Sequence, residues 1–387
     1  MATSPRLPYL DTARGLAAIS VITWHCYTAV ITNLETSNLY STPFHIFWYG
    51  EADVIFFFIH SGFILSYSHQ IFEKGISAFS YLSYILRRIF RIYPLFLFVL
   101  IISYLLKRTV YQDHSVNYLN PHFTKFWSNT VNIDGVVSQG VLAVRIPDDP
   151  DLRLIPQDWT LTVEVLLCPL IPFINYFNRK LRIFSWLLIL VWLKLLHLNT
   201  YLFEFAVGVS LFSFRHQISS IWNNTPMYVK SIFFVLAVLL YSCCFEFTNL
   251  FNGTSRAFTP GVDRFIVVTG CVLFFIFILH SKRIQVVLNF PVFVKIGKIC
   301  YSLYVNHIFL LICFSGTLMI ILHHFIKGPN WLIVLMFVLV IQTINILISL
   351  VTYNLIEKSF NKWGKSFSLY FTVLLQKRIG KISTLRK

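Results

Sequence analysis

The chain has 387 residues, of which 56% are hydrophobic, 17% aromatic and only 12% charged. A water-soluble domain has about 25% charged residues, so this composition excludes one. The formal charge of +16 does not indicate a nucleic-acid partner, because the basic residues flank apolar segments instead of forming a polar basic domain. The sequence therefore predicts an all-α integral membrane protein whose main partner is the lipid bilayer.

Apolar runs of about 20 residues, the length that crosses a bilayer as a helix, recur along the chain. We predict about ten transmembrane helices, near residues 12–31, 46–69, 85–106, 159–177, 182–198, 200–214, 229–247, 263–281, 299–322 and 331–355. Asp11 and Arg14 stand where the apolar core of a signal peptide would begin, so we expect the first helix to stay in the mature protein.

The distribution of Lys and Arg predicts the orientation, because short cytoplasmic loops are enriched in both. Alternate connections between the predicted spans are basic, with Lys74, Arg87, Arg88 and Arg91, then Arg179, Lys180 and Arg182, then Arg215 and Lys230, then Lys282, Arg283, Lys295 and Lys298. The opposite connections carry few such residues, and residues 32–45 carry none. This alternation places both termini in the cytoplasm.

Two segments lie outside the predicted spans. The polar stretch 107–157 falls on the outer side and is too long for a tight turn, so it is expected to be a lid or a binding loop. Residues 359–387 are basic, with aromatic and aliphatic residues between the charges, and are expected to form a cytoplasmic tail on the anionic inner leaflet. Residues 1–358, including the outer loop, then form one transmembrane domain.

The first predicted span, LDTARGLAAISVITWHC, contains three residues that are costly in hydrocarbon: Asp11, Arg14 and His25. On an ideal helix Arg14 and His25 share a face about 16 Å apart along the axis, with Asp11 within about 40° of it. Taken singly, Arg14 could snorkel to the cytoplasm beside Asp11, and His25 could be an interhelical hydrogen-bonding residue. Their alignment favours a functional stripe that runs towards the middle of the membrane.

A second polar group interrupts VIFFFIHSGFIL in the next span. His60 could pair with His25 or with a backbone carbonyl, and these two readings stand equal. Ser61 could be a helix-interface residue only, and Gly62 would permit close approach of a neighbouring helix.

The segment RRIFRIYP gathers three arginines at the cytoplasmic end of the third span. Arg88 and Arg91 are at i,i+3 and Arg87 and Arg91 at i,i+4, so their guanidiniums lie on one side of the helix. Such a fork suits phosphate groups, which accept bidentate hydrogen bonds. Ordinary positive-inside anchoring explains it equally well.

Two later spans also carry polar side chains. In DWTLTVE, Glu164 lies one turn into a span and needs a cationic or histidine partner there. In CYSLYVNH, Tyr301, Tyr304 and His307 follow one another at helical spacing, and Tyr304 and His307 are i,i+3 neighbours. A simple packing contact between these two is the plainer alternative.

The seven cysteines all lie in apolar segments without the spacing of a zinc site or a disulfide framework, so we expect them to pack in the core. No nucleotide-binding glycine motif, HExxH motif or CxxC pair occurs. We therefore predict no metal site and no permanently bound cofactor.

Together these segments resemble the acyltransferase-3 family of membrane O-acyltransferases, which move acyl groups, commonly acetyl from acetyl-CoA, onto cell-surface carbohydrates. LDTARGLA with its following His, VIFFFIHSGFIL, RRIFRIYP, DWTLTVE and CYSLYVNH stand in family order over nearly the whole chain. The chain departs from the family pattern at His60, at Leu167 and Cys168, and at Glu357-Lys358-Ser359, where the family often has a Pro.

The resemblance implies a role for each group. The catalytic set would be His25, with Arg14 handling donor or substrate, Asp11 holding Arg14, and Glu164 as the membrane carboxylate. The donor-binding arginines would be Arg87, Arg88 and Arg91. The substrate would lie among His60, Ser61, Tyr301, Tyr304 and His307.

The expected reaction moves an acyl group from acyl-CoA, as co-substrate, to a hydroxyl of a cell-surface or lipid-linked carbohydrate such as lipopolysaccharide or exopolysaccharide. The acyl group is expected to be acetyl, because acetyl is common in the family. The expected location is the inner membrane of a bacterium. His25 would act as general base, because imidazole changes protonation near neutral pH, or would carry the acyl group transiently.

Two other classes of function compete with this one. A transporter or flippase for a lipid-linked sugar would also place Arg, Asp and His inside the membrane, but the sequence shows no internal repeat and no matching pair of broken helices. A sensor or scaffold without chemistry would leave the polar stripe unexplained.

Overall fold

The computed structural model describes residues 7–30, 43–69, 72, 74–111, 119, 120, 123, 127, 131, 133–141, 153–180, 202–242 and 260–385. Every regular element in these ranges is a helix, which confirms the predicted all-α class for the described part of the chain. The predicted span 182–198 and most of the outer loop 107–157 lie outside the described residues.

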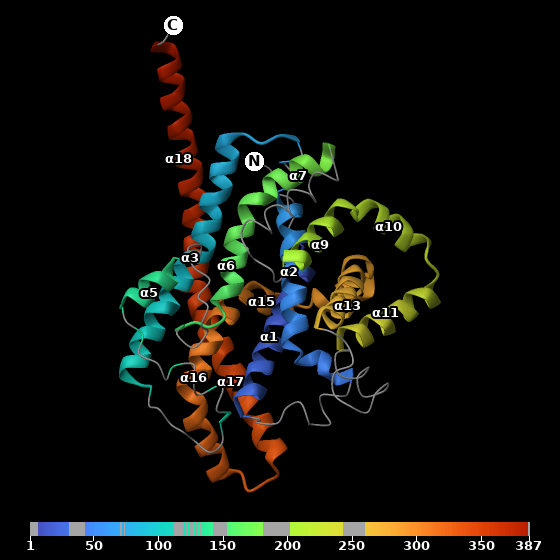
Figure 1. Cartoon of the computed structure of the whole chain (residues 1–387), viewed down its shortest axis with the longest axis vertical. Coiled ribbons are helices and arrows are strands. Elements are labelled where there is room, and N and C mark those ends of the chain that lie inside the picture. Colours follow the sequence, from blue (N-terminus) through green and yellow to red (C-terminus); the bar gives the residue numbers. More distant parts are fainter. Residues whose placement is uncertain are drawn as a thin grey trace.

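The helices follow one another as α1 (Pro8–Val30), η2 (Pro43–Phe47), α2 (Gly50–Ser68), α3 (Ala78–Thr109), α5 (Ile133–Gly140), α6 (Asp158–Leu167), η6 (Cys168–Leu170), α7 (Ile171–Lys180), α9 (Leu202–Ser213), α10 (Arg215–Asn224), α11 (Met227–Ser242), α13 (Pro260–His280), α14 (Lys282–Leu288), α15 (Pro291–Lys298), α16 (Cys300–Phe325), α17 (Asn330–Thr352), the π-helical η7 (Tyr353–Glu357) and α18 (Lys358–Leu385). In Figure 1, α3 and α18 run side by side along one flank, α9, α10, α11 and α13 form the opposite flank, and α1 and α2 lie between them.

The structure confirms the membrane character but not the count of ten spans. Four helical stretches in the described residues are long and apolar enough to cross a membrane: Ala78–Thr109, Asp158–Phe177, Cys300–Phe325 and Asn330–Gln376. A fifth is possible if the pair Arg264–His280 and Lys282–Leu288, bent by 87°, counts as one span.

The other predicted spans differ from a straight apolar helix for identifiable reasons. Those at 200–214 and 229–247 correspond to the shorter apolar helices α9 and α11. Those at 12–31 and 46–69 correspond to α1 and α2, of 23 and 19 residues, whose acids, arginine and histidines lower their mean hydropathy. The cytoplasmic placement of both termini stays a prediction.

The C-terminal segment is a helix in continuation of the last span. α17 passes through η7 into α18, which packs along α3, and the rings of Phe90 and Phe367 lie 5.5 Å apart in that contact. The tail from residue 359 is therefore helical and held against the bundle as far as its side chains are described, while its placement on the inner leaflet stays a prediction.

Glycines set how closely α1 and α2 approach their neighbours. A Cβ on Gly62 would lie well inside contact distance of the Phe205 carbonyl oxygen of α9, and one on Gly208 would do the same to the Ile59 carbonyl oxygen of α2. Small residues let helix backbones pack closely in membranes, so this pair brings α2 against α9 as Gly62 predicts. Gly15 of α1 and Gly297 of α15 repeat the arrangement.

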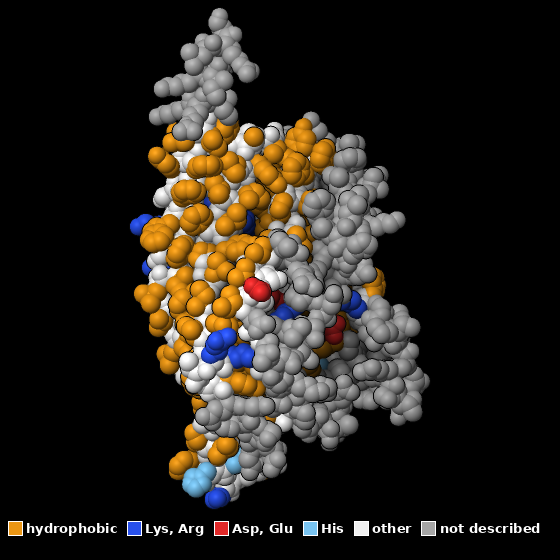
Figure 2. Space-filling view, turned by 60° about the vertical axis from the view of Figure 1, so that its left-hand side comes forward, with side chains coloured by type: hydrophobic (Ala, Val, Ile, Leu, Met, Phe, Trp, Pro, Cys, Tyr) orange, Lys and Arg blue, Asp and Glu red, His pale blue; other side chains and the backbone are white. Residues whose placement is uncertain are grey.

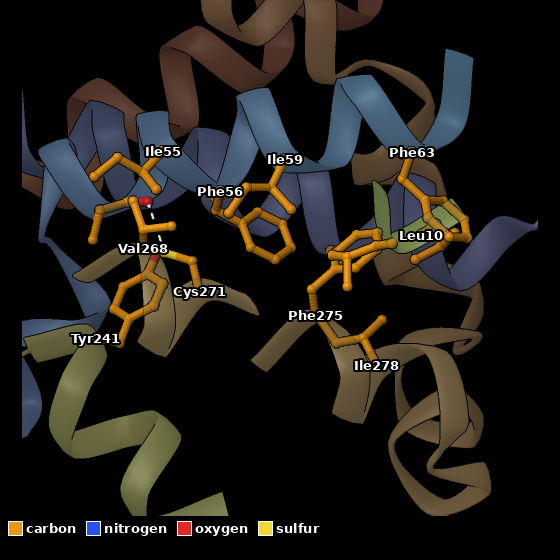
Figure 3. Close-up of a cluster of buried hydrophobic side chains, with 14 of the residues drawn as sticks. Leu10, Ile55, Phe56, Ile59, Phe63, Tyr241, Val268, Cys271, Phe275 and Ile278 are labelled. Atoms are coloured by element: carbon orange, nitrogen blue, oxygen red, sulfur yellow. Dashed lines mark hydrogen bonds between the residues drawn. The ribbon is translucent and has the colours of Figure 1, made fainter. Parts of the chain in front are cut away.

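A large apolar cluster fills the space between α1, α2 and α13 (Figure 3). Phe56, Ile59 and Phe63 of α2 meet Phe275 and Ile278 of α13, all almost fully buried. This side of the molecule is a packed core, and the cavity described below lies on the other side of α2.

Candidate active site

The polar stripe of α1 faces α16. The Arg14 guanidinium donates from Nε to Sγ of Cys300 at 3.4 Å, and the Cys300 thiol donates to the Arg14 carbonyl oxygen at 3.3 Å. Eleven residues further along, the rings of His25 and His307 stack obliquely, with centroids 5.1 Å apart. Both ends of the stripe thus meet one helix, which confirms that Arg14 and His25 share a face.

A cavity lies between α1, α2, α6 and α16. Its polar lining comes from Arg14, Ser61, Thr160, Glu164 and Tyr304. The rest of the lining is Val54, Phe57, Phe58, Leu161, Phe205, Cys300 and Tyr301. A largely apolar hollow with a few convergent polar groups is the usual form of a small-molecule site.

Tyr304 connects this cavity to the histidine pair. Its hydroxyl lies 2.8 Å from the Thr160 hydroxyl on the cavity wall, and its ring centroid is 5.6 Å from that of His307. His25 itself does not line the cavity and lies behind it, against His307. The arrangement is a cavity with Arg14 on its wall and the two imidazoles next to it.

The two ring nitrogens of His307 have different surroundings. Nδ1 lies 2.6 Å from the Tyr304 carbonyl oxygen, which can only accept, so Nδ1 carries the proton. Nε2 is buried without a hydrogen-bond partner among the described residues. In a neutral ring this nitrogen is a proton acceptor, and it belongs to a fully buried side chain packed on His25.

Glu164 has the cationic partner that its depth requires. Its Oε1 lies 3.9 Å from the Arg88 Nη1, a separation that is too long for a hydrogen bond. Arg88 also lies over the Tyr84 ring, with Cζ 5.7 Å from the centroid, and makes no hydrogen bond to another described residue. The pair therefore leaves guanidinium donors of Arg88 unused.

The other two arginines of α3 have different surroundings. Arg87 donates from Nη2 to the Ser83 hydroxyl at 2.7 Å and is held on its own helix. Arg91 lies near Arg14 and Glu164, close enough for electrostatic interaction with both. The structure thus brings Arg91 to the charged groups of the cavity and leaves Arg87 outside them.

The remaining predicted residues divide between the cavity and the packing around it. Ser61 and Tyr301 line the cavity, and the Tyr301 hydroxyl donates to the Ile92 carbonyl oxygen at 2.6 Å. His60 does not reach His25: its Nε2 bonds the Leu10 carbonyl oxygen at 3.0 Å, so the carbonyl alternative is the one observed. Asp11 is not on the cavity wall but is close enough to Arg14 for an electrostatic interaction.

Sequence reasoning missed one buried acid near the site. Glu357 ends η7, is 7% exposed, and accepts a hydrogen bond from the Ser302 hydroxyl at 2.7 Å. It lies in electrostatic reach of Arg14 and Arg91. The available signal was a carboxylate at the end of a long apolar span. In the structure it ends a π-helical turn, and such turns are often found at functional sites.

The start of α6, which carries Thr160 and Glu164, is fixed by the residues that precede it and by α5. Asp158 accepts from Arg153 at 2.8 Å and from Gln139 at 2.8 Å, and Gln157 donates to the Val305 carbonyl oxygen of α16 at 3.1 Å. These buried bonds hold the start of α6 against α16.

Comparison with known proteins identifies the family to which the chain belongs. A family model described as an acyltransferase domain, Acyl_transf_3, matches residues 7–351, and the chain belongs to that family. It is thus a membrane acyltransferase by family, and the predicted membership is confirmed. No curated protein and no solved structure matches the chain.

Proposed function

We propose that the protein transfers an acyl group, most simply acetyl, from acyl-CoA to a hydroxyl of a cell-surface or lipid-linked carbohydrate at the bacterial inner membrane. The observation that carries the proposal is the cavity with Arg14 and Glu164 on its wall and the His25–His307 pair next to it. Family membership supplies the reaction type, and the cavity supplies a place for it.

In the proposed reaction neutral His25 takes the proton of the acceptor hydroxyl as its oxygen attacks the thioester carbonyl. The carbon–sulfur bond then breaks, an ester forms, and CoA leaves as a thiolate that recovers the proton from His25. Such general-base catalysis contributes about 10²–10⁴-fold to a rate. In an alternative of the same class, a ring nitrogen of His25 carries the acyl group between donor and acceptor.

Arg14 and Arg91 are the cations proposed to receive the donor. Arg14 lines the cavity, and Arg91 lies within electrostatic reach of both Arg14 and Glu164. Guanidiniums bind phosphate oxygens in pairs, and one in the cavity also stabilises negative charge on the thioester oxygen during attack. Arg87, bonded to Ser83, would contribute from the periphery. The carboxylate of Glu164 partly neutralises the positive charge of these arginines.

The test is to incubate membranes that contain equal amounts of folded protein with labelled acetyl-CoA and acceptor glycan. Wild type is expected to label the glycan, and His25→Ala and Arg14→Ala to lose that labelling. Movement of a glycan lipid across the membrane without consumption of acetyl-CoA would instead support a flippase. Equal labelling by His25→Ala and wild type would overturn the proposed role of His25.

A further inference from the structure

His307 lies next to the candidate base His25 and behind the substrate cavity. Its side chain is fully buried and is not among the residues that line the cavity. The oblique stacking of the two imidazoles, with centroids 5.1 Å apart, is the only ring contact, hydrogen bond or ion pair that the His25 ring makes within the described residues. In the described part of the bundle, His307 is therefore the polar side chain that is placed to orient His25.

The orientation of the His307 ring is fixed by its own helix. Nδ1 donates to the Tyr304 carbonyl oxygen one turn earlier at 2.6 Å, so in the neutral ring Nε2 carries no proton and is an acceptor. Nε2 is buried, and no described residue gives it a hydrogen bond. A buried acceptor without a donor is costly, so we expect this nitrogen to accept a hydrogen bond in the working protein.

The part of α16 that carries His307 is fixed against α17. Asn306 donates to the Ser349 hydroxyl at 3.2 Å and to the Thr352 hydroxyl at 3.0 Å, and all three side chains are buried. Asn306 thus faces α17, while the next residue, His307, faces His25 of α1. Side chains on helices that are locked by such bonds are positioned more exactly than those on loops. The His307 ring is therefore presented to His25 at a defined place.

A histidine that acts as a general base needs one ring nitrogen without a proton, directed at the hydroxyl that it deprotonates. An acceptor beside the other nitrogen holds the N–H there, fixes this tautomer and stabilises the imidazolium that forms, as Asp does in a Ser-His-Asp triad. No carboxylate forms an ion pair with His25 within the described residues. The acceptor in the ring that packs on His25 is instead Nε2 of His307.

We infer that His307 is the positioning residue of the base, and that its Nε2 accepts a hydrogen bond from the His25 ring N–H, directly or through one water. The inference rests on the proposed function, which makes His25 the base. The acceptor hydroxyl gives its proton to the other nitrogen of His25, the imidazolium keeps its bond to Nε2, and the proton then passes to the CoA thiolate. His307 holds no substrate in this role, which differs from the substrate contact that the family resemblance implied.

Two substitutions of His307 separate this role from packing. Asn ends at the distance of Nδ1 and can keep the bond to the Tyr304 carbonyl, whereas Gln reaches as far as Nε2 and can offer an oxygen that accepts from His25. In membranes that supply the acceptor glycan, His307→Asn should lower kcat with labelled acetyl-CoA by about 10- to 100-fold, the range for groups that orient a metal-bound histidine. The KM for acetyl-CoA should stay close to that of wild type.

His307→Gln should keep more of the rate than His307→Asn. An equal or lower rate for His307→Gln would overturn the inference, because the bond to Tyr304 would then be the one that matters. The matched controls are His324→Asn and His324→Gln, at an exposed histidine in the last turn of α16, the end of the molecule where Figure 2 shows histidine side chains at the surface. Both controls should have the rate of wild type.

The second measurement needs no turnover. Full-length protein with ¹⁵N-labelled histidine is placed in lipid nanodiscs without substrate, and the ring signals of His25 are assigned by their loss in His25→Gln. They should show one tautomer in wild type and in His324→Asn, and a mixture of tautomers in His307→Asn. Unchanged His25 signals in His307→Asn would overturn the inference. The expected signals without acyl transfer by wild type would count against the proposed function alone, so the two failures are distinguishable.

Discussion

The two sides of α1 and α2 bury polar groups in different ways. On the side of the apolar cluster, each buried acid is fixed by a short hydrogen bond: Tyr241 donates to Asp53 at 2.7 Å and Arg264 to Glu204 at 2.6 Å. His60 is fixed in the same way by the Leu10 carbonyl oxygen. These groups join α2, α9, α11, α13 and α1, and their partners explain them as structural.

On the side of α16 the charged groups of the cavity lie close together without a short bond between opposite charges. Arg14 contacts a thiol, and the Arg88–Glu164 pair is 3.9 Å long. A loose pair of this kind can bind a substrate, whereas the Arg264–Glu204 pair at 2.6 Å is already closed. The difference in pairing, rather than the presence of charge in the membrane, marks the candidate site.

The largest effect is expected from a matched pair of histidine substitutions. His25→Gln should lower the rate of acetyl transfer by about 10²–10⁴-fold, because it removes the general base. His60→Gln keeps a donor for the Leu10 carbonyl and should leave the rate close to that of wild type. Transfer rates per folded molecule in membranes distinguish them, and an equal loss in both variants would remove the distinction between the two sides.

The next effect concerns packing on the structural side. Gly208→Ala places a methyl group against the Ile59 carbonyl oxygen and should lower the free energy of unfolding by about 1–3 kcal/mol, as overpacking does. Gly135→Ala, where the nearest atom would be 3.5 Å away, is the control and should change it little. Thermal denaturation in detergent measures both. An unchanged midpoint for Gly208→Ala would mean that α2 and α9 are not in close contact.

A smaller effect is expected at the cavity wall. Tyr304→Phe removes the hydroxyl that bonds Thr160 and should lower kcat/KM by roughly fivefold, equivalent to about 1 kcal/mol. Thr160→Val should cost a similar amount, and the double variant should cost less than the sum because the two hydroxyls share one bond. Strict additivity of the two losses would show that the hydroxyls act separately.

The smallest effect is expected at Asp53. Asp53→Asn keeps an oxygen that can accept from Tyr241, so stability should fall by about 1 kcal/mol or less and the transfer rate should not change. Thermal denaturation and a transfer assay on the same preparation measure both quantities. A large loss of rate with unchanged stability would place a functional acid on the side assigned here to structure.

Composition and the length of the apolar runs were enough to predict the all-α class, helical spacing the shared face of Arg14 and His25, and residue type the close approach at Gly62, because each depends on local sequence alone. The count of ten spans is not confirmed by the described residues, and the bend of 87° between α13 and α14 was not predicted because it depends on contacts distant in sequence. The sequence left the partner of His60 open for the same reason: the Leu10 carbonyl belongs to another helix.

The division of the three arginines of α3 was also beyond the sequence. Arg87, Arg88 and Arg91 lie on one side of the helix, yet their surroundings differ. Arg87 bonds Ser83 of its own helix, Arg88 lies 3.9 Å from Glu164, and Arg91 is in electrostatic reach of both Arg14 and Glu164. Glu357 reaches the site only because α17 continues through η7 beside α16. Such assignments require the packed bundle.

The central claim is tested most directly by the surface carbohydrate of cells that lack the gene and are complemented with either wild type or His25→Ala. NMR of the purified polysaccharide or lipid-linked glycan should show O-acetyl signals restored by wild type and absent with His25→Ala at equal protein levels in the membrane. Full restoration of those signals by His25→Ala would contradict the account.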